Sequence, residues 1–67
     1  MSLHEYQQSQ EVDATHPPFY ALVMAAMVKA DSHNAALLRQ AFPEVWDELQ
    51  ARYNAPGGRL PSDAGGG

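Results

Sequence analysis

The residues best suited to hold a ligand lie near the C-terminal end of the chain, where arginines flank a pair of glycines. An arginine can donate two hydrogen bonds to one phosphate, and successive backbone N–H groups in a glycine turn form a nest for an anion. A neighbouring aromatic ring can stack on a base. One interpretation is therefore a small anionic, nucleotide-type ligand bound at a subunit interface. Its contacts would come from Arg39, Arg52, Tyr53, Asn54, Gly57, Gly58 and Arg59.

The other interpretation of the same stretch is the capped end of a helix. Asn54 tolerates the left-handed conformation that ends many helices, and Pro56 cannot continue a helix. Tyr53 would then lie in the core, with the arginines in solvent. Two adjacent glycines after a helix are common without a ligand, so the sequence favours this interpretation.

Three carboxylates, Glu44, Asp47 and Glu48, are spaced to share one surface of a helix. Oxygen ligands at this spacing could hold Mg²⁺ or Ca²⁺. The commoner meaning of acidic residues after a helix start is a solvated face, which the positive end of the helix dipole stabilises. We therefore predict no metal site there.

The histidines His16 and His33 each stand next to a predicted helix start and could act as general bases if a carboxylate lay near them. No nucleophile motif accompanies them, and Ser32 is better placed to cap a helix than to attack a substrate. We predict no catalytic residue, no cofactor and no enzymatic activity.

Charge and cysteine content narrow the class of protein further. The formal net charge is −4, with only four lysines and arginines in 67 residues. A nucleic-acid binder must neutralise phosphates with clustered basic side chains, so we expect no nucleic-acid partner. The absence of cysteine excludes a disulfide and a thiolate site. The polar N-terminus lacks the pattern of a secretory leader, and we expect a cytoplasmic protein.

The stretch from Phe19 to Val28 reads FYALVMAAMV, and every residue in it is apolar or aromatic. A helix that is apolar on all sides is either buried in protein or spans a membrane. A span needs about 20 apolar residues, roughly twice the length of this run. We therefore predict a helix buried in protein, without contact with a membrane.

A chain this short has difficulty covering such a helix alone. A single core in a domain below about 70–80 residues rarely supplies more than about 3–5 kcal/mol, so small domains usually add disulfides, a metal or a partner chain. With no cysteine and no metal motif, we predict a homo-oligomer held together through this helix. The predicted interface residues are Phe19, Tyr20, Val23, Met24 and Met27.

Prolines and capping residues predict an all-α fold of two to three short helices: a helical hairpin plus a third helix behind a proline. A residue before a proline avoids the α region, so His16 and Pro17 should precede the first helix. Pro18 can occupy the first position of this helix, which is predicted to run to about Ala30.

The next two helices are predicted from the signals between them. Asp31 and Ser32 both suit the N-cap of a helix over residues 33–41. Pro43 suits the first position of a helix over residues 43–53. A single kinked helix over residues 33–53 is the alternative that the sequence leaves open.

The polar composition of both ends divides the chain into three segments. Residues 1–15 are rich in Gln and Glu and are predicted to form a mobile arm that could order on a partner. Residues 16–58 form the small helical domain. Residues 59–67 form a flexible tail that ends in glycines.

The segments PFYALVMAAM and FPEVWDELQARYNAPGG look similar to short phage or prophage reading frames of no assigned function. The resemblance implies a small accessory protein of viral or mobile-element origin, for which non-catalytic roles are favoured. The leading prediction is a non-enzymatic interaction protein that binds a host component. The alternative is an oligomeric protein that binds or sequesters a small anionic ligand.

Overall fold

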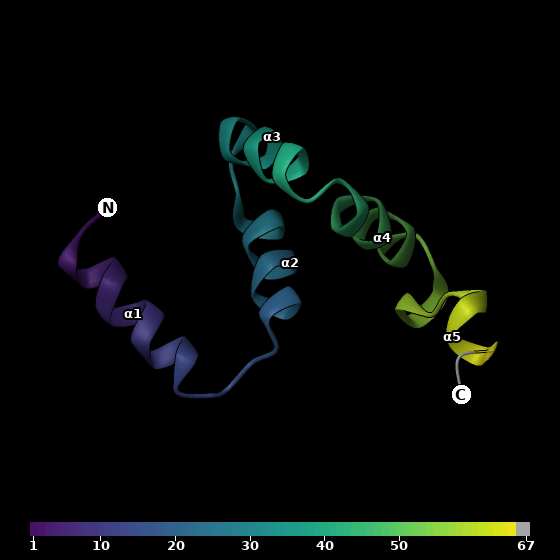
Figure 1. Ribbon diagram of the computed structural model, residues 1–67, viewed down its shortest axis with the longest axis horizontal. Helices are drawn as coiled ribbons and strands as arrows, with labels where there is room; N and C mark the ends of the chain where they lie inside the picture. The colour runs from purple at the N-terminus through teal and green to yellow at the C-terminus, as the bar shows by residue number, and fades with distance from the viewer. Residues whose placement is uncertain (66–67) are drawn as a thin grey trace.

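Helices make up all of the regular secondary structure in residues 1–65, the part of the chain that the computed structural model describes (Figure 1). The predicted all-α class is therefore confirmed. The predicted count of two to three helices is too low, because one further helix forms at each end. The elements are α1 (Leu3–Asp13), α2 (Phe19–Lys29), α3 (Ser32–Ala41), α4 (Pro43–Tyr53), the 3₁₀ turn η1 (Pro56–Gly58) and α5 (Pro61–Gly65).

The apolar helix α2 begins and ends close to the predicted residues. Pro18 is extended, with φ −61° and ψ 149°, and its carbonyl accepts a hydrogen bond from the backbone N–H of Ala21 at 3.0 Å. Pro18 is thus the N-cap and not the first helical residue. α2 has 11 residues, and none of the helices described is both long and apolar enough to cross a membrane.

α3 begins at a side-chain cap. Asp31 Oδ1 accepts a hydrogen bond from the backbone N–H of Asn34 at 2.8 Å. Asp31 itself is extended, with ψ 175°, as an N-cap residue must be to direct its side chain at the first turn. Of the two residues that the sequence offered, Asp31 is therefore the cap and Ser32 the first residue of the helix.

Phe42 separates α3 from α4, so the single kinked helix is not formed. Its φ of −133° and ψ of 64° lie outside the helical region, as expected for a residue before proline. The Phe42 N–H still donates to the Leu38 carbonyl at 2.8 Å, and the Phe42 carbonyl accepts from the Trp46 N–H at 3.0 Å. The proline therefore bends the chain without a loop, and α3 and α4 stay in contact.

The N-terminal segment is helical where the sequence predicted an arm without organised structure. Ser2 Oγ accepts a hydrogen bond from the backbone N–H of Glu5 at 3.2 Å and caps α1. Every residue of α1 is exposed, and it contacts none of the other helices in the described part of the chain. Within the described chain this helix is therefore held by local contacts such as the cap, and its mobility and ordering on a partner stay predictions.

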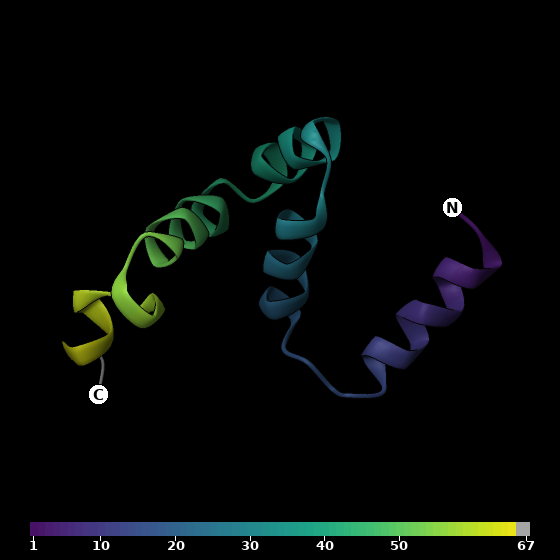
Figure 2. The same cartoon turned by 180° about the vertical axis from the view of Figure 1, so that it is seen from behind.

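His16 turns the chain away from the end of α1. Its φ of 53° is left-handed, and its backbone N–H donates to the Asp13 carbonyl at 2.9 Å. His16 thus avoids the right-handed α region before Pro17, as predicted, but through the left-handed conformation that often ends a helix. Figures 1 and 2 show α1 and α2 as two separate arms joined by an extended segment.

The C-terminal segment adds α5 where the sequence predicted a flexible tail. Asp63 in this helix contacts Arg52 in α4. Residues 66–67 of the predicted tail lie outside the described residues.

The hydrophobic core lies where α2 meets α3 and α4, and it is small. Among the side chains described, the buried apolar ones are Val23 and Met27 of α2, with 8% and 4% of their surface exposed. The radius of gyration is 14.0 Å, whereas a compact chain of this length has about 11 Å. The single subunit is therefore extended and covers few of its own apolar side chains.

Candidate functional site

Arg52, in the last turn of α4, is the centre of a polar cluster. Its Nε donates to Glu48 Oε2 at 3.1 Å, and its Nη1 donates to the Gly58 carbonyl at 2.8 Å. Nη1 and Nη2 also donate to the two carboxylate oxygens of Asp63, at 2.7 and 2.9 Å. These bonds occupy most of the donors of the guanidinium. The two-point contact with Asp63 holds α5 against the end of α4.

Pairing stabilises the ionised forms of both partners. The hydrogen bond from Arg52 is the main cause that holds the pKa of Asp63 well below its usual range, and the backbone N–H of Leu60, 2.9 Å from Oδ2, adds to it. The hydrogen bonds to Asp63 and then Glu48 raise the pKa of Arg52 above its already high value. Both side chains of the pair are partly exposed, so solvent screens their attraction. The cluster is a structural link between two helices.

The glycine turn is closed by its own backbone. Gly57 and Gly58 have φ values of 62° and 69°, which favour glycine. The N–H of Gly58 donates to the Ala55 carbonyl at 3.0 Å, and the N–H of Arg59 donates to the Pro56 carbonyl at 3.3 Å. Two of the donors that a nest would turn toward an anion are therefore used within the turn.

The other predicted ligand residues do not converge on that turn. Arg39 lies over the ring of Trp46, with 5.9 Å from the guanidinium carbon to the ring centre, and so links α3 to α4. Tyr53 is 84% exposed, which also differs from the core position expected for a capped helix end. Arg59 is exposed.

Asn54 completes the end of α4. Its Nδ2 donates to the Gln50 carbonyl at 2.9 Å, and its backbone is right-handed, with φ −91° and ψ −1°, so it does not supply the left-handed cap that the sequence suggested. The contacts of Asn54, Arg52 and the glycines favour the helix-end interpretation. The nucleotide site stays a prediction.

Two of the predicted interface residues lie in the core of the subunit itself. Val23 and Met27 pack toward α3 and α4 and offer almost no free surface to a second copy. Phe19 and Tyr20 are exposed, and their ring centres are 5.1 Å apart. Phe19 also lies 6.1 Å from the ring of Phe42. Val23 and Met27 therefore belong to the core of the subunit, and the oligomer interface itself stays a prediction.

The side of α2 that faces away from this core carries residues that the prediction missed. Ala21, Leu22, Ala25 and Val28 are all exposed, and the helical period places them on one continuous strip. We call this strip the open face of α2. Lys29, the last residue of the helix, falls on the same strip and is its charged end. The strip follows from a helical wheel once Val23 and Met27 are known to point inward.

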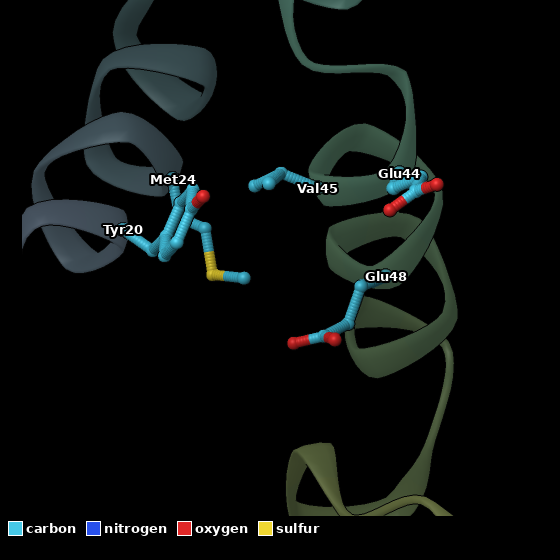
Figure 3. Close-up of a pocket in the computed structure, with 5 residues that line it drawn as sticks. All are labelled: Tyr20, Met24, Glu44, Val45 and Glu48. Carbon is cyan, nitrogen blue, oxygen red and sulfur yellow. The ribbon is translucent and has the colours of Figure 1, made fainter.

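A groove of about 290 Å³ lies between α2 and α4. Tyr20 and Met24 reach into it from α2, and Val45 and Glu48 extend toward them from α4 (Figure 3). Glu44 completes the lining, one turn before Glu48. We call this hollow the acidic groove. Met24, a predicted interface residue, is half-buried here.

No family model, curated protein or solved structure matches the chain. The resemblance to phage and prophage reading frames therefore stays a prediction.

The arrangement of charged groups limits the chemistry that this part of the chain can do. Within the described residues, no three His, Asp or Glu side chains are grouped to hold a metal ion. Asp47 does not line the acidic groove, so the three carboxylates of α4 do not act together there. The groove of the described surface places apolar side chains beside carboxylates.

Proposed function

We propose that this chain is a non-catalytic interaction protein that associates with copies of itself through the open face of α2. The observation that carries the proposal is the exposure of that face. Leu22 and Val28 keep 38% and 72% of their surface exposed in the isolated subunit. Ala21 and Ala25 have short side chains, which allow another helix to approach closely.

The energetic argument starts from the small core. Removing apolar surface from water is the main driving force for folding and for association, at about 25 cal/mol per Å². Within the described subunit, α2 buries only Val23 and Met27 among its large side chains. A small domain without cross-links needs to bury more apolar surface than this. A second copy packed on the open face would bury that surface.

The shape of the subunit supports the same proposal. α1 has 11 residues and packs against no other described helix, whereas an isolated helix shorter than about 12–15 residues is only marginally stable in water. Its Leu3 and Tyr6 are 70% and 60% exposed. α1 stands clear of α2 in both views, so these side chains are open to a partner copy (Figures 1 and 2).

Sedimentation equilibrium of the full chain, from micromolar to submillimolar concentration, tests the proposal. The expected result is a mass that rises to a whole-number multiple of the 7.3 kDa chain, with helical circular dichroism throughout. A folded monomer of 7.3 kDa at every concentration overturns it.

A further inference from the structure

The acidic groove has an apolar floor and a charged rim. Met24 and Val45 form the floor and are half-buried, and the ring of Tyr20 borders it. The carboxylates of Glu44 and Glu48 stand on the side of α4 (Figure 3). Such a combination fits a side chain with a long apolar stem and a polar end.

The charge of the rim is only partly compensated. Glu48 uses Oε2 for Arg52, and that arginine is shared with Asp63. Glu44 has neither an ion pair nor a side-chain hydrogen bond within the described part of the chain. No basic residue lines the groove. A cation entering it therefore meets negative potential from neighbouring carboxylates.

The groove has the size of the smallest small-molecule pockets, and its lining suits a long side chain. Pockets that enclose a drug-sized ligand have about 300–1,000 Å³, and this one has about 290 Å³. Lysine and arginine lay their methylene stems on apolar surface and keep the charge at its edge. Methionine adapts to amphipathic helices of varied sequence, and a tyrosine ring attracts a cation.

We infer that the acidic groove is a docking site for a basic amphipathic segment of another protein. An Arg or Lys stem of that segment lies over Met24 and Val45, and its cationic end pairs with Glu44 and Glu48. The inference extends the proposed interaction role to a second surface. It does not depend on self-association through the open face.

A second copy of this chain is the less favoured occupant. Each copy carries a net charge of −4. A symmetric contact through the groove would bring Glu44 and Glu48 of one copy against the same residues of the other, and like charges oppose such a contact. An anionic ligand is disfavoured for the same reason.

The test is a ¹H–¹⁵N NMR titration of the full chain with a synthetic helical peptide of leucine and lysine. The control peptide has the same leucines and glutamate at every lysine position. The basic peptide is expected to produce saturable shifts at Tyr20, Met24, Val45 and Glu48, and the acidic peptide none. Raising the salt concentration should weaken the binding of the basic peptide, because salt screens the exposed carboxylates of the rim.

Two variants separate the groove from the overall charge. Glu44→Gln removes a rim carboxylate and should raise the dissociation constant roughly two- to fivefold, the range of an exposed ion pair. Asp47→Asn changes the net charge equally on the same helix but outside the groove lining, and should change it much less. Glu48 is left intact because it also binds Arg52.

Four results would overturn the inference. They are shifts confined to the open face at Ala21 and Val28, equal binding of both peptides, equal effects of the two variants, and shifts at Glu44 and Val45 of α4 that follow protein concentration without peptide. The last result assigns the groove to a second copy. Failure of self-association is seen separately, in the mass measured by sedimentation, and leaves the peptide titration unaffected.

Discussion

Replacing Val28 by lysine should separate the oligomer without unfolding the subunit. Val28 is the penultimate residue of α2, and 72% of its surface is exposed. Lysine forms helices more readily than valine, and a positive charge is favourable near the C-terminal end of a helix. The substitution therefore leaves the core and the stability of α2 intact.

The magnitude follows from the exposed fraction. Complete burial of a valine side chain stabilises by about 1.5 kcal/mol or more, and 72% of Val28 remains to be covered in the isolated subunit. Association through this side chain is therefore worth about 1 kcal/mol per subunit, and a two-fold symmetric pair contains it twice. The dissociation constant should rise by at least about 30-fold, since about 2 kcal/mol is lost and a lysine cannot be buried unpaired.

The assay is sedimentation equilibrium of the wild type and of two variants over the same concentrations. The matched control is Val12→Lys, which changes the penultimate residue of another 11-residue helix and the net charge by the same amount. Val12 is 46% exposed, and the helical period places it on the side of α1 opposite to Leu3, away from the side chains proposed to meet a partner copy. An unchanged dissociation constant in Val28→Lys, or an equal change in both variants, would refute the reasoning.

Three further predictions concern the stability of the subunit. Met27→Ala should cost about 2–5 kcal/mol, comparable with all the stability expected of so small a core, so the variant should lose most of its helical circular dichroism at room temperature. A folded Met27→Ala monomer would show that this core is not what holds α2. Asp31→Ala should lower the free energy of unfolding in urea by about 0.5–2 kcal/mol, whereas Ser32→Ala should change it little; equal effects would contradict the assignment of the cap. The attachment of α5 should depend on pH. The lowered pKa of Asp63 stabilises the docked form above the unfolded pKa, near 4, and this contribution is lost as the pH falls toward the folded value. The amide signal of Leu60 should report release of α5 below about pH 4, and Asp63→Asn should show release at every pH; a Leu60 signal that does not change would contradict this.

The positions of the central helices could be predicted because their signals act over a few residues. Pro18, Asp31 and Pro43 mark the starts of α2, α3 and α4 through missing donors and a side-chain cap. The composition of residues 1–15 does not predict α1, because its apolar residues do not form a stripe and the cap at Ser2 is a local signal. α5 was missed because it is short and its attachment to Arg52 is not local.

The candidate ligand site also depended on a contact between residues far apart in the sequence. The sequence placed Arg52 beside glycines and suggested an anion as its partner. The partner observed is Asp63, eleven residues further along the chain, together with Glu48 one turn before it. The residue type predicts a group that binds an anion, but which anion it binds depends on where α5 lies.

The sequence by itself determined the all-α class, the limits of α2 to α4 and the shortage of core, because capping, proline geometry and chain length act without tertiary contacts. Only the tertiary structure decided which side of α2 is inside. The sequence of a helix that is apolar on every side does not show which side is buried. Val23 and Met27 lie in the core because α3 and α4 pack against that side. The same packing leaves Leu22 and Val28 in solvent and sets Met24 beside the carboxylates of α4.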